Sequence, residues 1–591
     1  MTVHRGEPGR RVGLTLLTIA IVLTLFAGRL VQLQGMESGY YKNLANKEKL
    51  STVALPAQRG QILGADGQIL AMTIETYTVT ADPPLIPAGQ LASVAAKAAG
   101  LLGMTAAKVQ YLLEHPAPHS PDYVKLASGV PAGNEQKLAA LDLPGIYYSG
   151  NFARAYPNGT TTADVVGSTS INPDTGVITG YSGLEATDNK LLTGNTGSEQ
   201  VEIGVDGEQI PLAGSQDTPA KNGESIKLTI IPSLQYQAQQ ACQQEVAKTK
   251  ADNCSVVVEQ PKTGAILAMA QWPNLAGTDI ADQSLFAPGS TAKVITAAAA
   301  FEHGGKTPMS TYNIPYQIFR GGQYIHDAEW SPGEKYTIAG IIANSSNIGM
   351  SQVAASITPQ TQYDYLKNFG LGQPTGLGLP AESPSAAYGP YALPPVSGWA
   401  ADERYTLSFG QGLSVNAVQM ASVYATIANG GVRVQPTLVA GTVNAGGQYK
   451  AAAASPSKRV IQANTAKELI SILQQVPAVD DQANQRWGDI AGYAIAAKTG
   501  TSSEPAQPGD KACPKTNALC IHGSSYIGMA PGNGPQVVVA VNVQNPKTET
   551  DYFGDEVAGP VFYSVMNAAL QTLQIQPQPG LVAPHVRLNA G

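Results

Sequence analysis

The sequence predicts an α+β fold behind a single membrane-spanning helix. Residues 12–33 are apolar or uncharged apart from Arg29, a run long enough to cross a bilayer as a helix. A stretch rich in Gly, Asp and Lys at 204–223 separates two parts of the chain. In the second part, predicted strands at both ends of the sequence enclose a run of predicted helices. That order is typical of one antiparallel sheet with helices packed on its faces.

The charges before the apolar run predict its orientation. Residues 1–11 hold three arginines and one glutamate. By the positive-inside rule this tail is cytoplasmic, the anchor covers 12–34, and the rest lies outside the membrane. The alternative is a cleaved signal peptide, but the run is long and its end offers no small-x-small cleavage site. We therefore expect a single-pass membrane protein.

Composition sets the class of protein. With 591 residues the chain predicts about two to four domains. The 43% hydrophobic content is enough for a large core, which excludes a disordered chain. The net charge is −7 and no basic block appears, so a nucleic-acid partner is not expected.

The four cysteines fall into two pairs that are close in sequence, in the part predicted to be external, where disulfides persist. We predict Cys242–Cys254 and Cys513–Cys520, one of three possible connectivities. Two alternatives stay open. The cysteines could remain free thiols, or Cys513, Cys520 and His522 could bind zinc, although their spacing matches no Cys-x-x-Cys pattern.

The first part, 35–223, reads as short strands, turns and a few helices without a cluster of catalytic groups. Asp66-Gly67 between two apolar runs predicts a hairpin, and residues 76–82 alternate as a strand. Helices are expected at 91–103 and 106–113.

The second part, 224–575, contains segments with the two-residue period of strands and segments with the 3.6-residue period of helices. Predicted strands lie at 226–231, 254–260, 265–271, 493–498, 525–530 and 536–543. Predicted helices lie at 232–250, 291–300, 336–344, 348–356, 416–429 and 465–475.

The chemistry is predicted to centre on Ser290 and Lys293. A Pro-Gly turn leads into Ser290, and residues 291–300 favour a helix that Gly304 and Gly305 can end. Side chains three residues apart share a helical face, so the hydroxyl and the amine can meet. A serine hydroxyl needs a neighbour to take its proton, and an unprotonated lysine can do so. Unpaired backbone N–H groups at the helix start also favour negative charge on a bound carbonyl.

Two further motifs follow. Ser345-Ser346-Asn347 lies between two predicted helices, and Lys498-Thr499-Gly500, followed by Thr501, ends a predicted strand. A fixed cation with two hydroxyls suits a carboxylate. Each motif also has a purely structural alternative: a helix cap at Ser290, a cap between helices at Ser345, and a strand end with a solvated lysine at Lys498.

The order of the motifs separates them from chance copies. Ser-x-x-Lys recurs at 455–458, where Pro456 breaks the helical pairing, and Lys-Thr-Gly recurs at 262–264 within a predicted hairpin. The copies beginning at Ser290, Ser345 and Lys498 give all three motifs in helix, loop and strand contexts in sequence. That order predicts a serine acyl enzyme.

This ordered set is the one found in penicillin-binding proteins and class A β-lactamases. From about Val12 to Leu570 the chain resembles a class B penicillin-binding protein, a monofunctional peptidoglycan D,D-transpeptidase, and most of all the division type. Further motifs that resemble the family are Arg59-Gly60, Asp66-Gly67, Arg154-x-Tyr156-Pro157, Gly180-x-x-Gly183-x-Glu185, Ser408 to Gly412 and Gly559 to Phe562. One departure is Gly64-Ala65, where the family has Asp-Arg.

The resemblance implies the roles of the site residues. Ser290 attacks the carbonyl between two terminal D-alanines, Lys293 takes its proton, and Ser345 relays a proton to the leaving D-alanine. Asn347 holds Lys293 and the substrate backbone. The terminal carboxylate of the substrate is bound by Lys498, Thr499, Gly500 and Thr501. The oxyanion hole consists of the backbone N–H groups of Ser290 and Thr501. No metal or organic cofactor is needed.

The resemblance also implies domains and partners. A pedestal, or dimerisation, domain would cover 35–223, a transpeptidase domain 224–575, and a tail 576–591. The expected partners are peptidoglycan stem peptides, β-lactams, the membrane, a membrane-embedded SEDS-type glycosyltransferase and divisome proteins.

Two other functions compete. A D,D-carboxypeptidase or β-lactamase would pass the acyl group to water, which requires a positioned base. Glu403 lies between the second and third motifs, but nothing marks it as that base. A penicillin-sensing receptor would need a signalling domain, for which the predicted cytoplasmic tail is too short. A divisome scaffold could coexist with catalysis.

Overall fold

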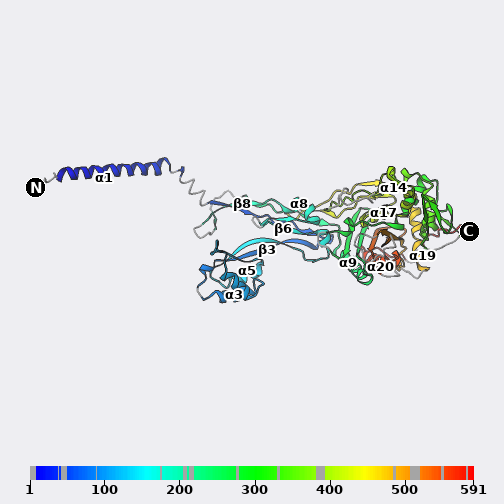
Figure 1. Ribbon diagram of the computed structural model, residues 1–591, viewed down its shortest axis with the longest axis horizontal. Coiled ribbons are helices and arrows are strands. Elements are labelled where there is room, and N and C mark those ends of the chain that lie inside the picture. Colours follow the sequence, from blue (N-terminus) through cyan, green and yellow to red (C-terminus); the bar gives the residue numbers. More distant parts are fainter. Residues whose placement is uncertain are drawn as a thin grey trace. The chain divides into compact units, whose positions relative to one another are not determined.

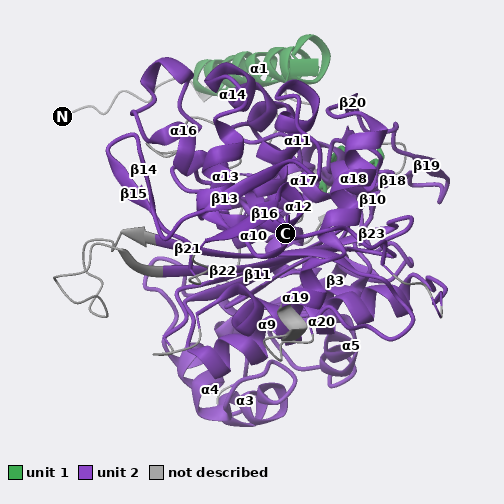
Figure 2. Cartoon of the chain, turned by 90° about the vertical axis from the view of Figure 1, so that its right-hand side faces the viewer, with its two compact units in different colours: residues 1–57, 194–222 green, residues 58–193, 223–591 purple. Residues whose placement is uncertain are grey.

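The computed structural model describes residues 8–37, 39–40, 50–87, 89–172, 176–203, 209–211, 218–274, 278–328, 333–380, 393–482, 487–505, 519–547, 552–578, 580 and 583–590. It consists of two compact units, 1–57 with 194–222 and 58–193 with 223–591 (Figure 2). Both contain helices and strands, and the predicted α+β class is confirmed.

The first unit holds the apolar N-terminal helix. Helix α1 (Pro8–Val31) continues into a short π-helical turn, η1 (Gln32–Met36), and the span from Gly9 to Met36 has a mean hydropathy of 2.2 in its most apolar window. This helix fits a single-pass membrane anchor. A three-stranded antiparallel sheet of β1 (Leu50–Leu55), β8 (Gly197–Ile203) and β9 (Gln209–Pro211) completes the unit. Strand β9 lies within the stretch 204–223 that composition predicts to be a connection.

One seven-stranded sheet of the second unit combines strands of the predicted pedestal with three strands from beyond residue 223, in the order β19-β18-β10-β2-β3-β4, with β5 paired to β3. The strands are β2 (Ile62–Leu63), β3 (Ile69–Ala81), β4 (Val124–Pro131), β5 (Ile146–Ala155), β10 (Ser225–Leu228), β18 (Val439–Val443) and β19 (Tyr449–Ala451). Helices α3 (Leu91–Ala99), α4 (Ala106–Glu114) and α5 (Ala132–Ala139) close an apolar core beside β3 (Figure 1). The predicted hairpin at Asp66-Gly67 is confirmed, but β3 runs without a break through residues 72–75, which the sequence pattern leaves between two strands.

Two arginines and one glutamate, from three separate motifs of the predicted pedestal, meet in one buried cluster. The Nε atoms of Arg59 and Arg154 lie 2.6 Å and 2.7 Å from the two carboxylate oxygens of Glu185. All three side chains are at most 2% exposed, so the two buried guanidinium groups share one carboxylate as their counter-charge. Short elements surround the cluster: α6 (Ala163–Val166), β6 (Thr169–Ile171), β7 (Ile178–Gly180), α7 (Gly183–Thr187) and α8 (Asn189–Thr193).

The departure at Gly64-Ala65 has a packing reason. A Cβ atom on Gly64 would lie 2.7 Å from Cγ of Pro232, the first residue of α9. The backbone N–H of Ala65 donates to the carbonyl of Ile230 at 2.8 Å. The turn therefore sits directly against the start of α9, where an aspartate side chain would not fit.

The part of the second unit that carries Ser290 and Lys498 is organised around a five-stranded antiparallel sheet in the order β12-β11-β23-β22-β21. Its strands are β11 (Asn253–Gln260), β12 (Ala265–Trp272), β21 (Ala496–Pro505), β22 (Leu519–Ala530) and β23 (Val537–Gln544). Helices α9 (Pro232–Thr249) and α20 (Gly554–Thr572) lie together against one face (Figure 1). Helix α17 (Ala417–Ala428) and α11 (Lys293–His303) belong to the larger core on the other face. Alternation along β11 produces this division, since Val256 and Val258 join the first core and Val257 the second.

The disulfide predicted between Cys242 and Cys254 is present and joins α9 to β11, with a Cα–Cα distance of 5.4 Å. Cys513 lies outside the described residues, so the predicted Cys513–Cys520 pair stays a prediction.

The second unit also contains smaller elements. The helices are α10 (Ile280–Gln283), α12 (Ile338–Ala343), α13 (Asn347–Ala354), α14 (Pro359–Asn368), α16 (Glu403–Thr406), α18 (Ala463–Leu473) and α19 (Val476–Gln482). Single-turn 3-10 helices are η2 (Pro83–Leu85), η3 (Gly289–Ala292), η4 (Val396–Gly398) and η5 (Leu407–Phe409). Two-stranded sheets pair β13 (Thr311–Ile314) with β16 (Glu334–Thr337), β14 (Ile318–Arg320) with β15 (Gln323–Ile325), and β17 (Val432–Val434) with β20 (Ser457–Arg459).

Two sequence predictions are corrected here. The helix expected from residue 336 begins at Ile338, because residues 334–337 pair with β13. The strand carrying Lys498 does not end with its motif but continues to Pro505, because residues 501–503 pair with 522–524 of β22.

A distant segment completes α12. The hydroxyl of Thr337, the N-terminal cap of α12, donates to the carbonyls of Arg587 and Leu588 at 2.7 Å and 3.0 Å and accepts from the N–H of Gly340 at 3.0 Å. Tyr336 and Asn589 form an isolated bridge. Residues 587–589 thereby secure the entry to the helix that leads to Ser345.

Candidate active site

The turn that carries Ser290 is wedged between two backbone segments. Gly289 has a φ of +55°, and a Cβ atom on it would lie 2.6 Å from the carbonyl oxygen of Thr501. Its N–H donates to the carbonyl of Gly410 at 3.0 Å. Only glycine permits both the positive φ and this approach. Ser290 lies in the 3-10 turn η3, one turn before the α-helix proper, and its side chain is partly exposed.

Lys293 is the first residue of α11 and is fully buried. Its Nζ atom lies 2.9 Å from Oγ of Ser290, as the spacing predicts. Burial lowers the pKa of Lys293 well below its ordinary value of 10.5, and the neighbouring cation Lys498 lowers it further, while Asp327 acts in the opposite direction. The chain therefore places a lysine that favours its neutral form against a serine hydroxyl.

Ser345 lies between the two buried lysines. Its Oγ is 3.3 Å from Nζ of Lys293 and 3.1 Å from Nζ of Lys498, and its carbonyl oxygen accepts a further hydrogen bond from Lys293. Its φ of +56° is a left-handed conformation that costs a non-glycine residue energy. This conformation turns both oxygens of Ser345 toward the lysines. The first and third motifs thus meet through the second.

Asn347 makes its hydrogen bond to a partner that the resemblance does not name. Its Nδ2 donates to the carbonyl of His326 at 3.3 Å. Among the described residues, the hydrogen bonds of Lys293 go to Ser290 and Ser345, and none goes to Asn347. The amide of Asn347 is partly exposed beside the motif.

Asp327 is a residue of this site that the sequence reasoning missed. Its Oδ2 accepts from the hydroxyl of Ser346 at 2.7 Å and its Oδ1 from the N–H of Ile348 at 2.9 Å. The same hydroxyl of Ser346 accepts from the N–H of Gly349 at 2.9 Å, so the carboxylate supports the capped start of α13. A lone aspartate 18 positions before Ser345 carries no motif by which the sequence could have shown it.

The Lys498-Thr499-Gly500 motif borders the serine turn from the middle of β21. The side chain of Lys498 is fully buried, and its Nζ donates to the carbonyl and the hydroxyl of Thr499 at 3.0 Å and 3.3 Å. A Cβ atom on Gly500 would lie 2.9 Å from the carbonyl oxygen of Pro288. Glycine is thus the residue that lets β21 approach the turn before Ser290. The hydroxyl of Thr501 accepts from the N–H of Gly554 at 3.1 Å.

The chance copies of the motifs lie elsewhere. Lys458 is in strand β20, where its Nζ donates to Oδ1 of Asn368 at 2.9 Å. Lys262 is in the turn between β11 and β12.

The ring of His522 stacks on Tyr552 with centroids 4.2 Å apart, and its Nδ1 lies 3.3 Å from Oγ of Ser503. The zinc alternative requires Cys513, which is outside the described residues.

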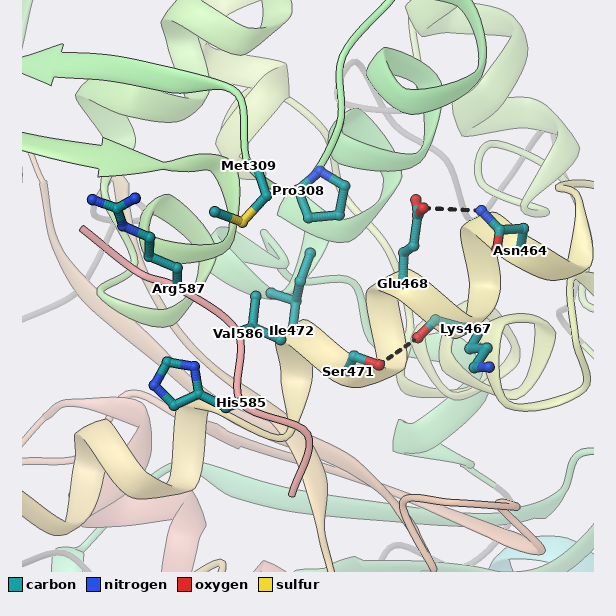
Figure 3. Close-up of a pocket in the computed structure, with 10 residues that line it drawn as sticks. All are labelled: Pro308, Met309, Asn464, Lys467, Glu468, Ser471, Ile472, His585, Val586 and Arg587. Atoms are coloured by element: carbon teal, nitrogen blue, oxygen red, sulfur yellow. Dashed lines mark hydrogen bonds between the residues drawn. The ribbon is translucent and has the colours of Figure 1, made fainter. Parts of the chain in front are cut away.

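A separate pocket of about 500 Å³ lies between α18 and the segment 585–587 (Figure 3). None of the predicted site residues lines it. The polar groups along α18 bond to one another, since Asn464 donates to Glu468 at 2.9 Å and Ser471 to the carbonyl of Lys467 at 3.0 Å (Figure 3). Within the part of the chain that the structure describes, the candidate site is therefore the cluster of Ser290, Lys293, Ser345 and Lys498.

Two protein-family models match the chain. Residues 254–567 match the family model of the penicillin-binding protein transpeptidase domain, and residues 54–228 match that of the penicillin-binding protein dimerisation domain.

Relatives resemble the chain over nearly its whole length. Penicillin-binding protein PbpB of Mycobacterium tuberculosis is 30% identical, with 98% of this chain and 86% of the relative covered. Peptidoglycan D,D-transpeptidase FtsI of Escherichia coli is 29% identical, with 95% and 91% covered.

Solved structures share the fold. A peptidoglycan synthetase from Bifidobacterium adolescentis superposes with a TM-score of 0.71 at 26% identity, over 92% of this chain and all of that one. Penicillin-binding protein 3 of Mycobacterium tuberculosis in complex with ampicillin gives a TM-score of 0.68 at 27% identity, over 91% of this chain and all of that one.

Proposed function

The chain belongs to the class B penicillin-binding proteins and is a serine-type peptidoglycan D,D-transpeptidase of the PBP3/FtsI type, and from that premise we propose that Ser290 is its nucleophile and Lys293 its general base. The observation that carries the assignment is the 2.9 Å contact between Nζ of Lys293 and Oγ of Ser290.

In the acylation step, Ser290 Oγ attacks the carbonyl carbon between the two terminal D-alanines of a stem peptide. Lys293 accepts the hydroxyl proton, which requires the neutral amine that its lowered pKa supplies. The new bond is the ester from Oγ to the carbonyl carbon, and the peptide C–N bond breaks. Ser345, within 3.3 Å of Lys293, passes the proton to the nitrogen of the leaving D-alanine.

Charge is stabilised at two places during this step. We assign the negative charge on the carbonyl oxygen to the backbone N–H groups of Ser290 and Thr501, which adjoin because Gly289 packs against the Thr501 backbone. Lys498, Thr499 and Thr501 bind the terminal carboxylate of the donor peptide. Gly500, between them, allows the close approach of β21 to the serine turn. We assign Asn347 to hydrogen bonding with the substrate backbone, because this last residue of the second motif is partly exposed.

In the second step, an amine of another stem peptide attacks the ester carbonyl. A new C–N bond forms, the bond to Oγ breaks, and the hydroxyl of Ser290 regains a proton through Lys293. The product is a cross-link, and the residues that acted in acylation act again in reverse order.

We propose that β-lactams inhibit the protein by acylating Ser290. A β-lactam offers a strained amide in place of the D-alanyl–D-alanine bond. Solved complexes of the Mycobacterium tuberculosis PBP3 with ampicillin and with aztreonam, at 27% identity, support this proposal.

We further propose a septal role, with α1 as a single-pass anchor, residues 1–11 in the cytoplasm and the bulk of the chain after the anchor outside the membrane. The basic N-terminal tail and the FtsI-like relatives support this arrangement. A SEDS-type glycosyltransferase embedded in the same membrane, with divisome proteins, would supply the glycan strands that this enzyme cross-links.

A hydrolase on the same scaffold finds less support. Such an enzyme requires a base that positions water beside the acyl group. The carboxylate of Glu403 accepts from the N–H of Ala400 at 2.9 Å, in the turn that precedes its own short helix.

Labelling with a fluorescent penicillin tests the assignment. The full chain should form a stable covalent adduct, and Ser290→Ala should form none. Lys293→Ala should also lose labelling, whereas Lys458→Ala should label normally. A label that decays within seconds would move the assignment to a β-lactamase, and labelling that persists in Ser290→Ala would remove Ser290 as the nucleophile.

A further inference from the structure

A hairpin beside the active site presents an exposed aromatic surface. Strands β14 and β15 pair in the register Ile318↔Ile325 and Phe319↔Tyr324. Side chains alternate across a strand, so the two isoleucines share the inner face and the two aromatic rings share the outer face. Ile325 is 7% exposed, whereas Phe319 and Tyr324 are 56% and 60% exposed.

Two further exposed rings, Tyr316 and His326, lie at the base of the hairpin, before β14 and after β15. Phe319 and Tyr324 lie with ring centroids 5.0 Å apart, and Tyr316, 63% exposed, lies 6.0 Å from the ring of His326. We call Tyr316, Phe319, Tyr324 and His326 the aromatic platform. Exposed rings cost solvation free energy unless something covers them, so a patch of this kind marks a binding surface.

The platform is rigidly placed at both ends of the hairpin. At the tip, Gly321 has a φ of +58° and packs against Asp402, to whose carboxylate Gln323 also donates. Beyond the base, the carbonyl of His326 accepts from Asn347 at 3.3 Å. The next residue, Asp327, supports Ser346. The hairpin lies at the left margin of the second unit in Figure 2.

Continuity with the active site limits what covers the platform. The substrate of the reaction is a peptide carried on a glycan strand, so a strand whose stem peptide reaches Ser290 must run over the surface around the second motif. Sugar rings present C–H faces that stack on aromatic rings and hydroxyls that pair with tyrosine and histidine. A protein partner would favour aliphatic side chains as well, and in this hairpin those face inward.

We propose that the aromatic platform is a subsite for the glycan strand of peptidoglycan. This inference rests on the proposed function, because it extends the surface around Ser290. The platform would orient the strand and leave acylation to Ser290 and the two lysines.

The test measures binding of peptide-free glycan strands, released from peptidoglycan by an amidase, to the full chain in detergent. Without stem peptides these strands cannot occupy the D-alanine site. We expect Phe319→Ala and Tyr324→Ala each to weaken the Kd by about fivefold or more, as the loss of one ring stack would. Phe319→Trp should bind at least as tightly as the wild type, and this variant guards against a loss caused by misfolding.

A matched control is Tyr181→Ala, which removes a tyrosine that is 78% exposed in the pedestal part. Its Kd should equal that of the wild type. Failure of wild-type chain to bind peptide-free strands, or a Kd equal in all variants, would overturn the inference and leave the platform to a protein partner. Fluorescent-penicillin labelling of the wild type separates the two proposals, because it reports on Ser290 without any glycan.

Discussion

The carboxylate of Asp327 accepts a hydrogen bond of 2.7 Å from the hydroxyl of Ser346, the middle residue of the second motif. Removing this carboxylate in Asp327→Ala also removes the acceptor for Ile348, and we expect acylation to slow by about tenfold to a hundredfold, since hydrogen bonds to charged groups contribute about 1.5–3 kcal/mol. Stopped-flow penicillin acylation measures the rate.

Asp327→Asn separates charge from hydrogen bonding. Its amide oxygen can still accept from Ile348, but the negative charge that raises the pKa of Lys293 is gone. The acidic limb of the pH–rate profile should therefore move to lower pH. Asp364→Asn, an exposed change on α14, is the control. A profile of Asp327→Asn that overlays the wild type would contradict the electrostatic part of this account.

The pH dependence of acylation should report the two buried lysines. Lys293 acts as a base when it is neutral, so the rate should rise with pH through the lowered pKa of Lys293. It should reach its plateau at a pH below 10.5, the ordinary pKa of lysine. Lys498→Ala removes the cation that lowers this pKa. The rate will fall overall because Lys498 also contacts Ser345, and its acidic limb should shift to higher pH. An unshifted limb would show that Lys498 does not set the pKa of Lys293.

Glu259 gives a stability prediction. It is fully buried in β11, neither carboxylate oxygen has a hydrogen-bond partner among the described residues, and burial raises its pKa from 4.5 to about 8, against the opposing charge of Arg433. The folded state holds this proton more tightly than the unfolded state, so the stabilising contribution is complete below about pH 4.5 and is lost as pH rises through about 8.

Glu259→Gln removes that titration while keeping the shape. The melting temperature of the wild type should decline between pH 5 and 9 more steeply than that of the variant. Glu114→Gln, an exposed change on α4, should leave the slope unchanged. Parallel curves for wild type and Glu259→Gln would mean that Glu259 is ionised in the folded protein.

Glu185 should be one of the most sensitive positions of the pedestal. Glu185→Gln leaves the buried guanidinium groups of Arg59 and Arg154 without a counter-charge, and breaking a buried pair in this way costs about 3–5 kcal/mol. Urea unfolding followed by tryptophan fluorescence measures the loss. Glu75→Gln on the exposed side of β3 should change stability by less than about 0.5 kcal/mol.

The Cys242–Cys254 disulfide closes a short loop, with a sequence separation of 12 between two fully buried side chains. Cys242→Ala/Cys254→Ala should lower stability by about 2–4 kcal/mol under oxidising conditions. Calorimetry with and without reductant measures this effect. If reductant lowers the melting temperature of the double variant as much as that of the wild type, the stabilising bridge lies elsewhere in the chain.

Sequence reasoning identified the parts of the site whose chemistry demands particular residues in order. Ser290, Lys293, Ser345 and Lys498 come together within hydrogen-bond distance, since each motif needs the other two. Long periodic elements such as α9 and β11 were also predictable, because each presents a continuous apolar face.

The rest depends on partners that are distant in the chain. Strand β16 exists because residues 334–337 pair with β13, and four residues carry too short a pattern to predict it. The extension of β21 past Gly500 is fixed by pairing with β22, and Asp327 gains its importance only where the hairpin turns toward α13. The glycine at position 64, where the family has aspartate, is explained by Pro232, a residue distant in the chain that packs against it.

The cap of α12 has a consequence for the order of events during biosynthesis. The hydroxyl of Thr337 reaches carbonyls about 250 residues further along the chain, at Arg587 and Leu588. A nascent polypeptide that has emerged only as far as its second motif therefore lacks the segment that secures the approach to Ser345. Assembly of the chemistry should wait until synthesis has passed residue 588, so a ribosome-bound intermediate would be unreactive toward penicillin even with Ser290 and Lys293 already outside the exit tunnel.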